Sequence, residues 1–98
     1  MNLEDTIPLM LSDDYRKRGI AEYFQIKIRV QQNKEFIRKW KNNELTFTPL
    51  NSIEQSEMQL KAMELYLYTL RDRLRTVFEI EDSDDIGFEV FVLKFIEK

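Results

Sequence analysis

The chain has 98 residues, a formal net charge of −3, and neither cysteine nor histidine. A chain of this length forms one domain with a modest core. The missing cysteine excludes disulfides, and the missing histidine removes the commonest general base and metal ligand. Glycine-rich phosphate loops and serine elbows are also missing from the sequence. We therefore expect a protein that is not an enzyme and that uses no cofactor and no metal.

Charge is distributed unevenly along the chain. Residues 13–43 carry nine Lys and Arg against four Asp and Glu, whereas residues 79–98 carry two against seven. The net negative total argues against a DNA or RNA polymer as partner, because such binders need a basic surface. A small anionic ligand held by a few cations stays compatible with this pattern. The sequence has no secretory signal and no apolar run long enough to cross a membrane, so we expect a cytoplasmic location.

Residues 1–12 are expected to form an N-terminal arm, and a long helix should follow from residue 13 to about residue 43. Ser12 is a candidate N-cap for this helix, with acids in the first turn where they favour the helix dipole. Wound at about 100° per residue, its apolar side chains form two stripes. The first is Tyr15, Tyr23, Ile26, Val30, Ile37 and Trp40, and the second is Ile20, Phe24 and Ile28. Two stripes need two packing partners, and we expect the second partner to be another copy of the chain.

A second helix is expected from Asn51 or Ser52 to about Phe78. The run from Ser52 to Gln55 fits a capping box, Asn51 to Glu54 offers the same geometry one residue earlier, and apolar residues recur at helical spacing behind them. In the connection between the helices, we expect Phe47 to fill the end of the hairpin together with Phe36 and Trp40. The predicted fold class is mainly α: an antiparallel two-helix hairpin over residues 13–78 that assembles into a homo-oligomer.

Residues 79–98 are expected to form an acidic linker followed by a short C-terminal β-strand over residues 86–96. Aromatic and β-branched residues dominate this segment, which is typical of strands. A single strand is not stable alone, so it would pair with its copy in another subunit or with the N-terminal arm. A short terminal helix is the alternative interpretation.

Tyr23, Lys27 and Arg29 are candidate ligand-binding residues on the first helix. Tyr23 and Lys27 lie one turn apart, so the phenol could stack on a base while the ammonium meets a phosphate. Arg29 points roughly 200° away from Lys27, so these two cations would not share a pocket within one subunit. The simpler interpretation is a half-buried tyrosine beneath an extended lysine.

On the second helix, Gln59, Met63, Tyr66 and Arg73 follow one another at spacings of four, three and seven residues. They could present an amide, a thioether, a phenol and a guanidinium along one groove, and Gln59, Tyr66 and Arg73 are the candidate ligand-binding residues among them. The simpler interpretation is a hairpin seam with polar edges.

Three short patterns resemble small proteins of the crAss-like phage group, which share a helical-hairpin domain with anti-CBASS and anti-Thoeris signal sponges. The resemblance covers about residues 3–78. The patterns are Glu22, Tyr23, Gln25, Lys27 and Arg29; then Leu45, Thr46, Phe47, Thr48 and Pro49; then Gln59, Leu60, Ala62, Met63, Tyr66, Leu67, Leu70 and Arg73. The C-terminal segment lies outside the resemblance.

The resemblance implies a non-enzymatic phage protein in the cytoplasm of an infected bacterium. Such proteins assemble through their hairpins and sequester cyclic oligonucleotides or cyclic ADP-ribose-type signals made by bacterial immune enzymes. By position, it implies stacking on Tyr23, phosphate contacts from Lys27 and Arg73, and edge contacts from Gln59 and Tyr66.

Two other functions remain open from the sequence. The chain could be a small inhibitor or adaptor that binds a host defence protein through its helical face or its C-terminal strand. It could also be a structural helical oligomer that binds no ligand.

Overall fold

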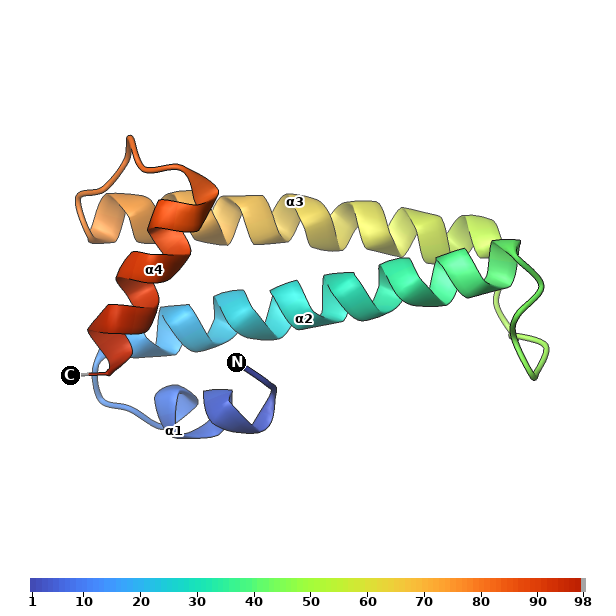
Figure 1. Cartoon of the computed structure of the whole chain (residues 1–98), viewed down its shortest axis with the longest axis horizontal. Coiled ribbons are helices and arrows are strands. Elements are labelled where there is room, and N and C mark those ends of the chain that lie inside the picture. The colour runs from blue at the N-terminus through green and yellow to red at the C-terminus, as the bar shows by residue number, and fades with distance from the viewer. Residues whose placement is uncertain (98) are drawn as a thin grey trace.

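The computed structural model describes residues 1–97, which are helical with connecting turns and contain no strand. The elements are η1 (Glu4–Thr6), a 3₁₀ turn, and then α1 (Ile7–Met10), α2 (Tyr15–Lys41), α3 (Ile53–Val77) and α4 (Asp85–Ile96). The two long helices, α2 and α3, form an antiparallel hairpin, as Figure 1 shows. The N-terminal and C-terminal segments pack near the same end of the hairpin: α1 lies beside α2, and α4 crosses both long helices. The mainly helical prediction is confirmed.

Both long helices begin at the side-chain caps that their sequences provide. The cap of α2 is Asp14 and not Ser12 as expected: the Asp14 carboxylate accepts a hydrogen bond from the backbone N–H of Arg16 at 2.9 Å, while the Ser12 hydroxyl accepts from the Asp14 N–H at 3.0 Å. At the start of α3, the Ser52 hydroxyl accepts from the Gln55 N–H at 3.2 Å, and the Gln55 side chain accepts from the Ser52 N–H at 3.1 Å. These contacts satisfy donors that a helix terminus leaves without partners, and they confirm the predicted capping box.

Two residues after each long helix ends, the backbone enters the left-handed region. Asn43 has φ 57° and Glu79 has φ 58°. After α3, the N–H of Ile80 donates to the carbonyl of Arg75 at 2.9 Å, which closes the last turn. Asparagine tolerates this conformation better than most residues, whereas glutamate has no such compensation. The backbone at Glu79 is therefore a site of local strain.

Except at Tyr15, which is 63% exposed, the chain itself packs against both apolar stripes of α2. The first stripe packs on α3, where Gly19 allows close approach: a Cβ at this position would lie 3.0 Å from Leu74 Cδ2. On the other side, Ile20 is completely buried in one cluster with Phe88 and Val92 of α4, which are also completely buried. The η1–α1 segment covers a further part of α2. The second stripe of α2 thus does not require the second copy that the sequence led us to expect there.

The predicted strand at residues 86–96 is wrong, because this segment is helix α4. Asp84 caps the helix, and its carboxylate accepts from the Gly87 N–H at 2.6 Å. Phe88 and Val92 lie four residues apart, so a helix presents both to the hairpin. A helix also satisfies its own backbone hydrogen bonds, whereas a single strand would leave them open. Tertiary packing has overridden the β preference of the side chains.

The aromatic residues near the turn do gather, but Phe47 does not fill the hairpin. Its ring lies 6.2 Å from that of Phe36, and Phe36 lies edge-on to Trp40 at 5.7 Å between centroids. Phe47 remains 59% exposed. The turn therefore presents an aromatic surface to solvent instead of a closed plug.

We predict that Glu79→Gly stabilises the protein. Glycine adopts the left-handed conformation without steric cost, which should raise the free energy of unfolding by about 0.5–1 kcal/mol. The melting temperature should rise by about 3–6 °C, which differential scanning calorimetry would measure. Glu81→Gly is the matched control, since it removes the same charge from the same linker without a positive φ at its position. Equal melting temperatures for the Glu79→Gly and Glu81→Gly proteins would contradict the strain at Glu79.

Candidate ligand-binding face

Tyr23 and Lys27, both predicted ligand residues, lie beneath α4 and share one partner. The Tyr23 hydroxyl donates to Glu89 Oε1 at 3.3 Å, and Lys27 Nζ forms an ion pair with the same carboxylate. The Tyr23 ring is only 3% exposed and lies edge-on to Phe88 at 5.1 Å. A ligand could reach the Tyr23 ring only after α4 moved, whereas the Lys27 side chain remains 30% exposed and is occupied by Glu89.

The environment of Tyr23 also fixes its protonation. Burial of the ring, followed by the nearby Glu89 carboxylate, raises the pKa of the Tyr23 phenol well above its usual value. The hydroxyl therefore keeps its proton at neutral pH and stays a donor to Glu89.

A second polar contact holds the start of α4 to α3. Asp85 Oδ1 lies 3.0 Å from Arg71 and 2.8 Å from Arg75. The sequence placed Asp85 in a solvated linker, and nothing in its pattern pairs it with these arginines. Asp85 and Glu89 are one turn apart, so α4 brings two carboxylates down on cations of both long helices.

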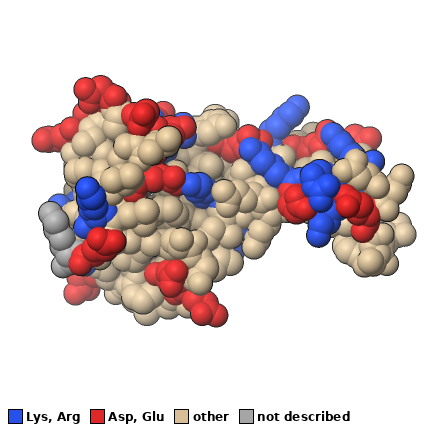
Figure 2. Space-filling model, viewed as in Figure 1, with Lys and Arg blue, Asp and Glu red and all other residues tan. Residues whose placement is uncertain are grey.

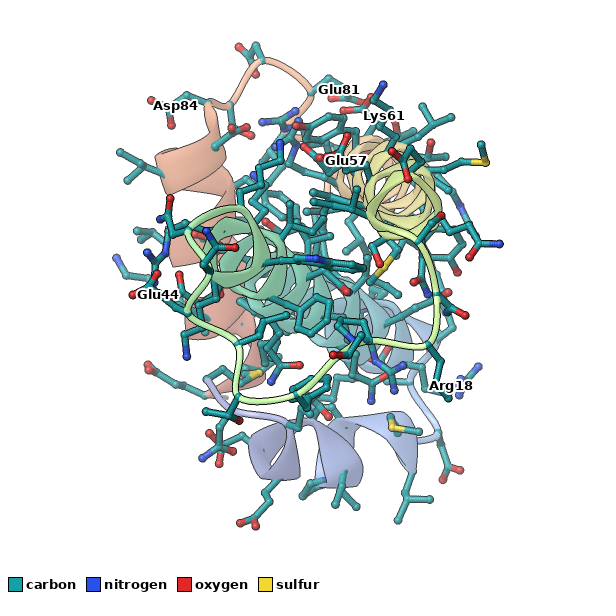
Figure 3. All side chains as sticks on the ribbon, turned by 90° about the vertical axis from the view of Figure 1, so that its right-hand side faces the viewer. Arg18, Glu44, Glu57, Lys61, Glu81 and Asp84 are labelled. Atoms are coloured by element: carbon teal, nitrogen blue, oxygen red, sulfur yellow. The ribbon has the colours of Figure 1, made fainter. Side chains whose placement is uncertain are left out.

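The opposite side of the hairpin carries the other four predicted residues. Figure 3, which looks along the hairpin, places α4 and Arg18 on opposite sides of it. Seven-residue spacing keeps side chains on one side of a helix, so Glu22 and Arg29 of α2 share a face, as do the α3 residues. We call the surface formed by these side chains the open face: Glu22, Arg29, Gln59, Tyr66 and Arg73.

One direct contact joins the two helices across the open face. The Tyr66 hydroxyl donates to the Glu22 carboxylate, while its ring remains 45% exposed. Arg29 and Arg73 are exposed, and the salt bridges of residues 1–97 include neither of them. The open face thus offers two cations and one aromatic ring to solvent.

A small cleft lies on the open face near the start of α2. Its volume is about 80 Å³, and it is lined by Tyr15, Arg16, Gly19, Glu22, Leu70, Arg73, Leu74 and Val77. Pockets that enclose a small-molecule ligand measure about 300–1,000 Å³. The cleft could hold one group of a ligand, such as a phosphate at Arg73, but it could not enclose a nucleotide.

A wider groove lies at the other end of the same face, beside the hairpin turn. Its volume is about 530 Å³, and it is lined by Asn33, Phe36, Phe47, Thr48, Pro49, Leu50, Asn51, Ser56 and Gln59. Amides and hydroxyls can bond the edges of a base, and aromatic rings can stack on it. No Lys or Arg lines this groove. The sequence analysis assigned Phe36 and Phe47 to the core and so did not predict that they line a groove.

The charges reinforce the contrast between the two ends of the molecule. Figure 2 shows acidic side chains over the linker and the start of α4, and intermixed cations and acids near the turn.

Within residues 1–97, no three acidic, histidine or cysteine side chains come together in a way that would bind a metal ion. Within the same residues, we find no helix with the length and hydropathy needed to cross a lipid bilayer.

The arrangement defines a small helical-hairpin protein whose open face carries aromatic and cationic side chains. The family model described as Sequestin matches residues 13–76, which span the hairpin. The chain therefore belongs to the Sequestin family, and the resemblance to hairpin sponges noted in the sequence is confirmed. The family name suggests sequestration of a signal by binding. Searches of curated proteins and of solved structures gave no match.

We predict that Glu89 couples to Lys27 in stability. Glu89→Gln removes the charge at nearly constant shape, and Lys27→Met removes the partner cation. Chemical denaturation of both single variants and the double variant should give a coupling energy of about 1 kcal/mol for this partly buried pair. Lys34 and Glu64, whose atoms lie 3.8 Å apart with an exposed lysine, form the control pair and should couple more weakly. Additive effects of the two substitutions would show that the Lys27–Glu89 ion pair does not stabilise the position of α4.

Proposed function

We propose that the protein is a phage anti-defence sponge that binds a cyclic oligonucleotide or a cyclic ADP-ribose-type immune signal. The ligand is held on the open face, in the cytoplasm of the infected bacterium, and is not cleaved. One observation carries this proposal: an exposed tyrosine, Tyr66, stands between an exposed Arg73 and an amide, Gln59, at equal spacings on one helix. Membership of the Sequestin family supports a sequestering role.

The groups on the open face match the parts of a nucleotide. Tyr66 stacks on a base through its exposed ring. Arg73 and Arg29 meet phosphate oxygens, and the guanidinium fork suits bidentate contacts to them. Gln59 donates to and accepts from a base edge, and Glu22 accepts from an amino or ribose hydroxyl group.

Tyr23 and Lys27 take a different role in this proposal. Glu89 already occupies both of them, so they hold α4 against the hairpin and shape the domain that carries the open face. Their direct contact with a ligand stays a prediction from the sequence.

A chain with neither histidine nor cysteine offers few groups for cleaving a phosphodiester or glycosidic bond. Sequestration needs only affinity and enough copies of the protein to lower the free signal concentration. We therefore propose that the bound signal stays intact and that the protein acts stoichiometrically.

A second candidate is binding to a host defence protein through the outer side of α4. Ile86, Val90 and Leu93 are 76%, 46% and 36% exposed, at helical spacings of four and three. An amphipathic helix of this kind can dock in an apolar groove of a partner. With the strand excluded, this helical surface replaces strand addition as the way in which a protein partner would bind.

We predict that a cyclic di- or trinucleotide, or a cyclic ADP-ribose isomer, raises the melting temperature of the purified protein. At about 100 times its dissociation constant, a ligand adds roughly 2.7 kcal/mol to the folded state. For a domain of this size, the shift is on the order of 10 °C. Arg73→Ala should abolish the shift while leaving the ligand-free melting temperature nearly unchanged, because the Arg73 side chain is exposed. Tyr66→Ala should also abolish the shift, but with a lower ligand-free melting temperature because the hydrogen bond to Glu22 is lost.

Lys94→Ala is the matched control for the loss of one exposed cation, since Lys94 lies on α4, away from the open face. It should retain the full shift. A panel in which no ligand shifts the wild-type protein would overturn the sponge proposal. Loss of anti-defence activity in Val90→Glu, with unchanged activity in Arg73→Ala, would instead favour the protein-partner candidate.

A further inference from the structure

The connection between α2 and α3, residues 42–52, is held loosely at the free end of the hairpin. Figure 1 shows it reaching beyond the ends of both long helices. Within the described chain, the hydrogen bonds include none made by residues 45–51. A segment with so few polar contacts can shift at low energetic cost.

The rings of Phe36 and Phe47 form a wall between two grooves at this end. One is the groove of about 530 Å³ that contains Gln59, and the other has a volume of about 400 Å³. The second groove is lined by Gln32, Glu35, Phe36, Lys39, Glu44, Leu45, Thr46 and Phe47. The two linings share only the two phenylalanine rings. A group placed between these rings would therefore reach both grooves.

The two rings stand almost as far apart as the walls of an aromatic sandwich. Their centroids are 6.2 Å apart, and the angle between their planes is 30°. Stacked rings are spaced by about 3.4 Å, so a base held between two rings sets them about 7 Å apart. Phe36 lies on α2 and packs edge-on against Trp40 at 5.7 Å, whereas Phe47 lies on the loosely held connection. A movement of Phe47 by about 1 Å would thus admit a base.

We infer that Phe36 and Phe47 form a clamp for a nucleobase. The base inserts between the two rings, its polar edge lies in the groove at Gln59, and its phosphate lies in the second groove at Lys39. The inference rests on the proposed function for the nature of the ligand, a nucleotide. It extends the open face to the hairpin turn and adds a base site there.

The groove at Gln59 suits the edge of a base that carries an amino group. The Asn33 amide nitrogen donates to the Arg29 carbonyl at 3.0 Å and also contacts the Met63 sulfur at 3.4 Å. These contacts leave Asn33 Oδ1 as an acceptor for an exocyclic amino group. The exposed Gln59 amide can both donate and accept. Adenine, guanine and cytosine have such amino groups.

The second groove supplies the cation that the groove at Gln59 lacks. Two carboxylates share its lining with Lys39, and Arg38 binds both of them: Glu35 at 2.6 Å and Glu44 at 2.9 Å. The salt bridges of residues 1–97 do not include Lys39. Its ammonium group is therefore available to a phosphate. Rings, base-edge groups and a cation thus meet within one chain.

Trp40 reports directly on the clamp, because it is the only tryptophan of the chain and touches Phe36. Its indole N–H gives a single signal in a proton–nitrogen NMR spectrum. We expect adenosine monophosphate, titrated to millimolar concentration, to shift this signal. Ribose 5-phosphate, which has the sugar and the phosphate but no base, should leave it unchanged. A signal that adenosine monophosphate does not shift, or that both compounds shift equally, would overturn the clamp.

Substitution of Phe47 tests the stacking itself. Phe47→Leu should weaken the binding of adenosine monophosphate by about tenfold or more, and Phe47→Tyr, which keeps a ring, should retain it. Both should melt close to the wild-type temperature, because Phe47 is 59% exposed. Tyr68→Leu is the matched control, since it removes a half-exposed ring of α3 that lines neither groove. Wild-type affinity in the Phe47→Leu protein would exclude the sandwich.

The same measurements separate this inference from the proposed function. The Arg73→Ala protein should keep the Trp40 response, because Arg73 lies at the other end of the open face. A cyclic signal that raises the melting temperature equally in wild-type and Phe47→Leu proteins, with no Trp40 response to adenosine monophosphate, would overturn the clamp and leave the sponge proposal standing. A Phe47-dependent Trp40 response, with no cyclic signal raising the melting temperature, would support the clamp and overturn the proposed function.

Discussion

Apolar side chains on two sides of α2 must both be buried, and the rest of the structure depends on how the chain meets this constraint. α3 covers one side, and the two ends of the chain cover the other, with Phe88 and Val92 of α4 completely buried against Ile20. Because α3, α1 and α4 together bury the apolar side chains of α2, no further element is needed, and one side of the hairpin is left without a covering helix. That side is the open face, so the position of the candidate site follows from the way the core is completed.

The same arrangement divides the cations of the hairpin into two groups: those paired with carboxylates of α4, and those exposed on the open face. α4 lowers two carboxylates, Asp85 and Glu89, onto cations of α2 and α3, and these pairs hold the helix in place. Arg29 and Arg73 on the open face have no such carboxylate within the described residues. The cations beside α4 are already paired with its carboxylates, whereas an exposed guanidinium can meet a phosphate without displacing such a partner. The local negative charge of the C-terminal segment thus explains why a cationic hairpin is not basic over its whole surface.

Sequence patterns predicted the parts that depend on local rules. Helical periodicity and the capping box at Ser52 located both long helices to within a few residues. The C-terminal segment was predicted wrongly because its β-branched and aromatic side chains favour a strand locally, while the cap at Asp84 and the packing of Phe88 decide for a helix. Helical spacing grouped Gln59, Met63, Tyr66 and Arg73 along one groove, but Met63 packs against the core. Whether Tyr23 is buried or open to a ligand depends on the position of α4, and no local sequence pattern encodes that position.

The central claim is that the open face retains an intact signalling nucleotide. The most direct measurement is to incubate the purified protein with a mixture of cyclic nucleotides and cyclic ADP-ribose isomers, wash it by size-exclusion chromatography, release the bound fraction by heat, and identify it by mass spectrometry. The account predicts that one ligand class is retained with unchanged mass, and that the Arg73→Ala protein retains none. Recovery of no nucleotide, or of a hydrolysed product, would contradict it.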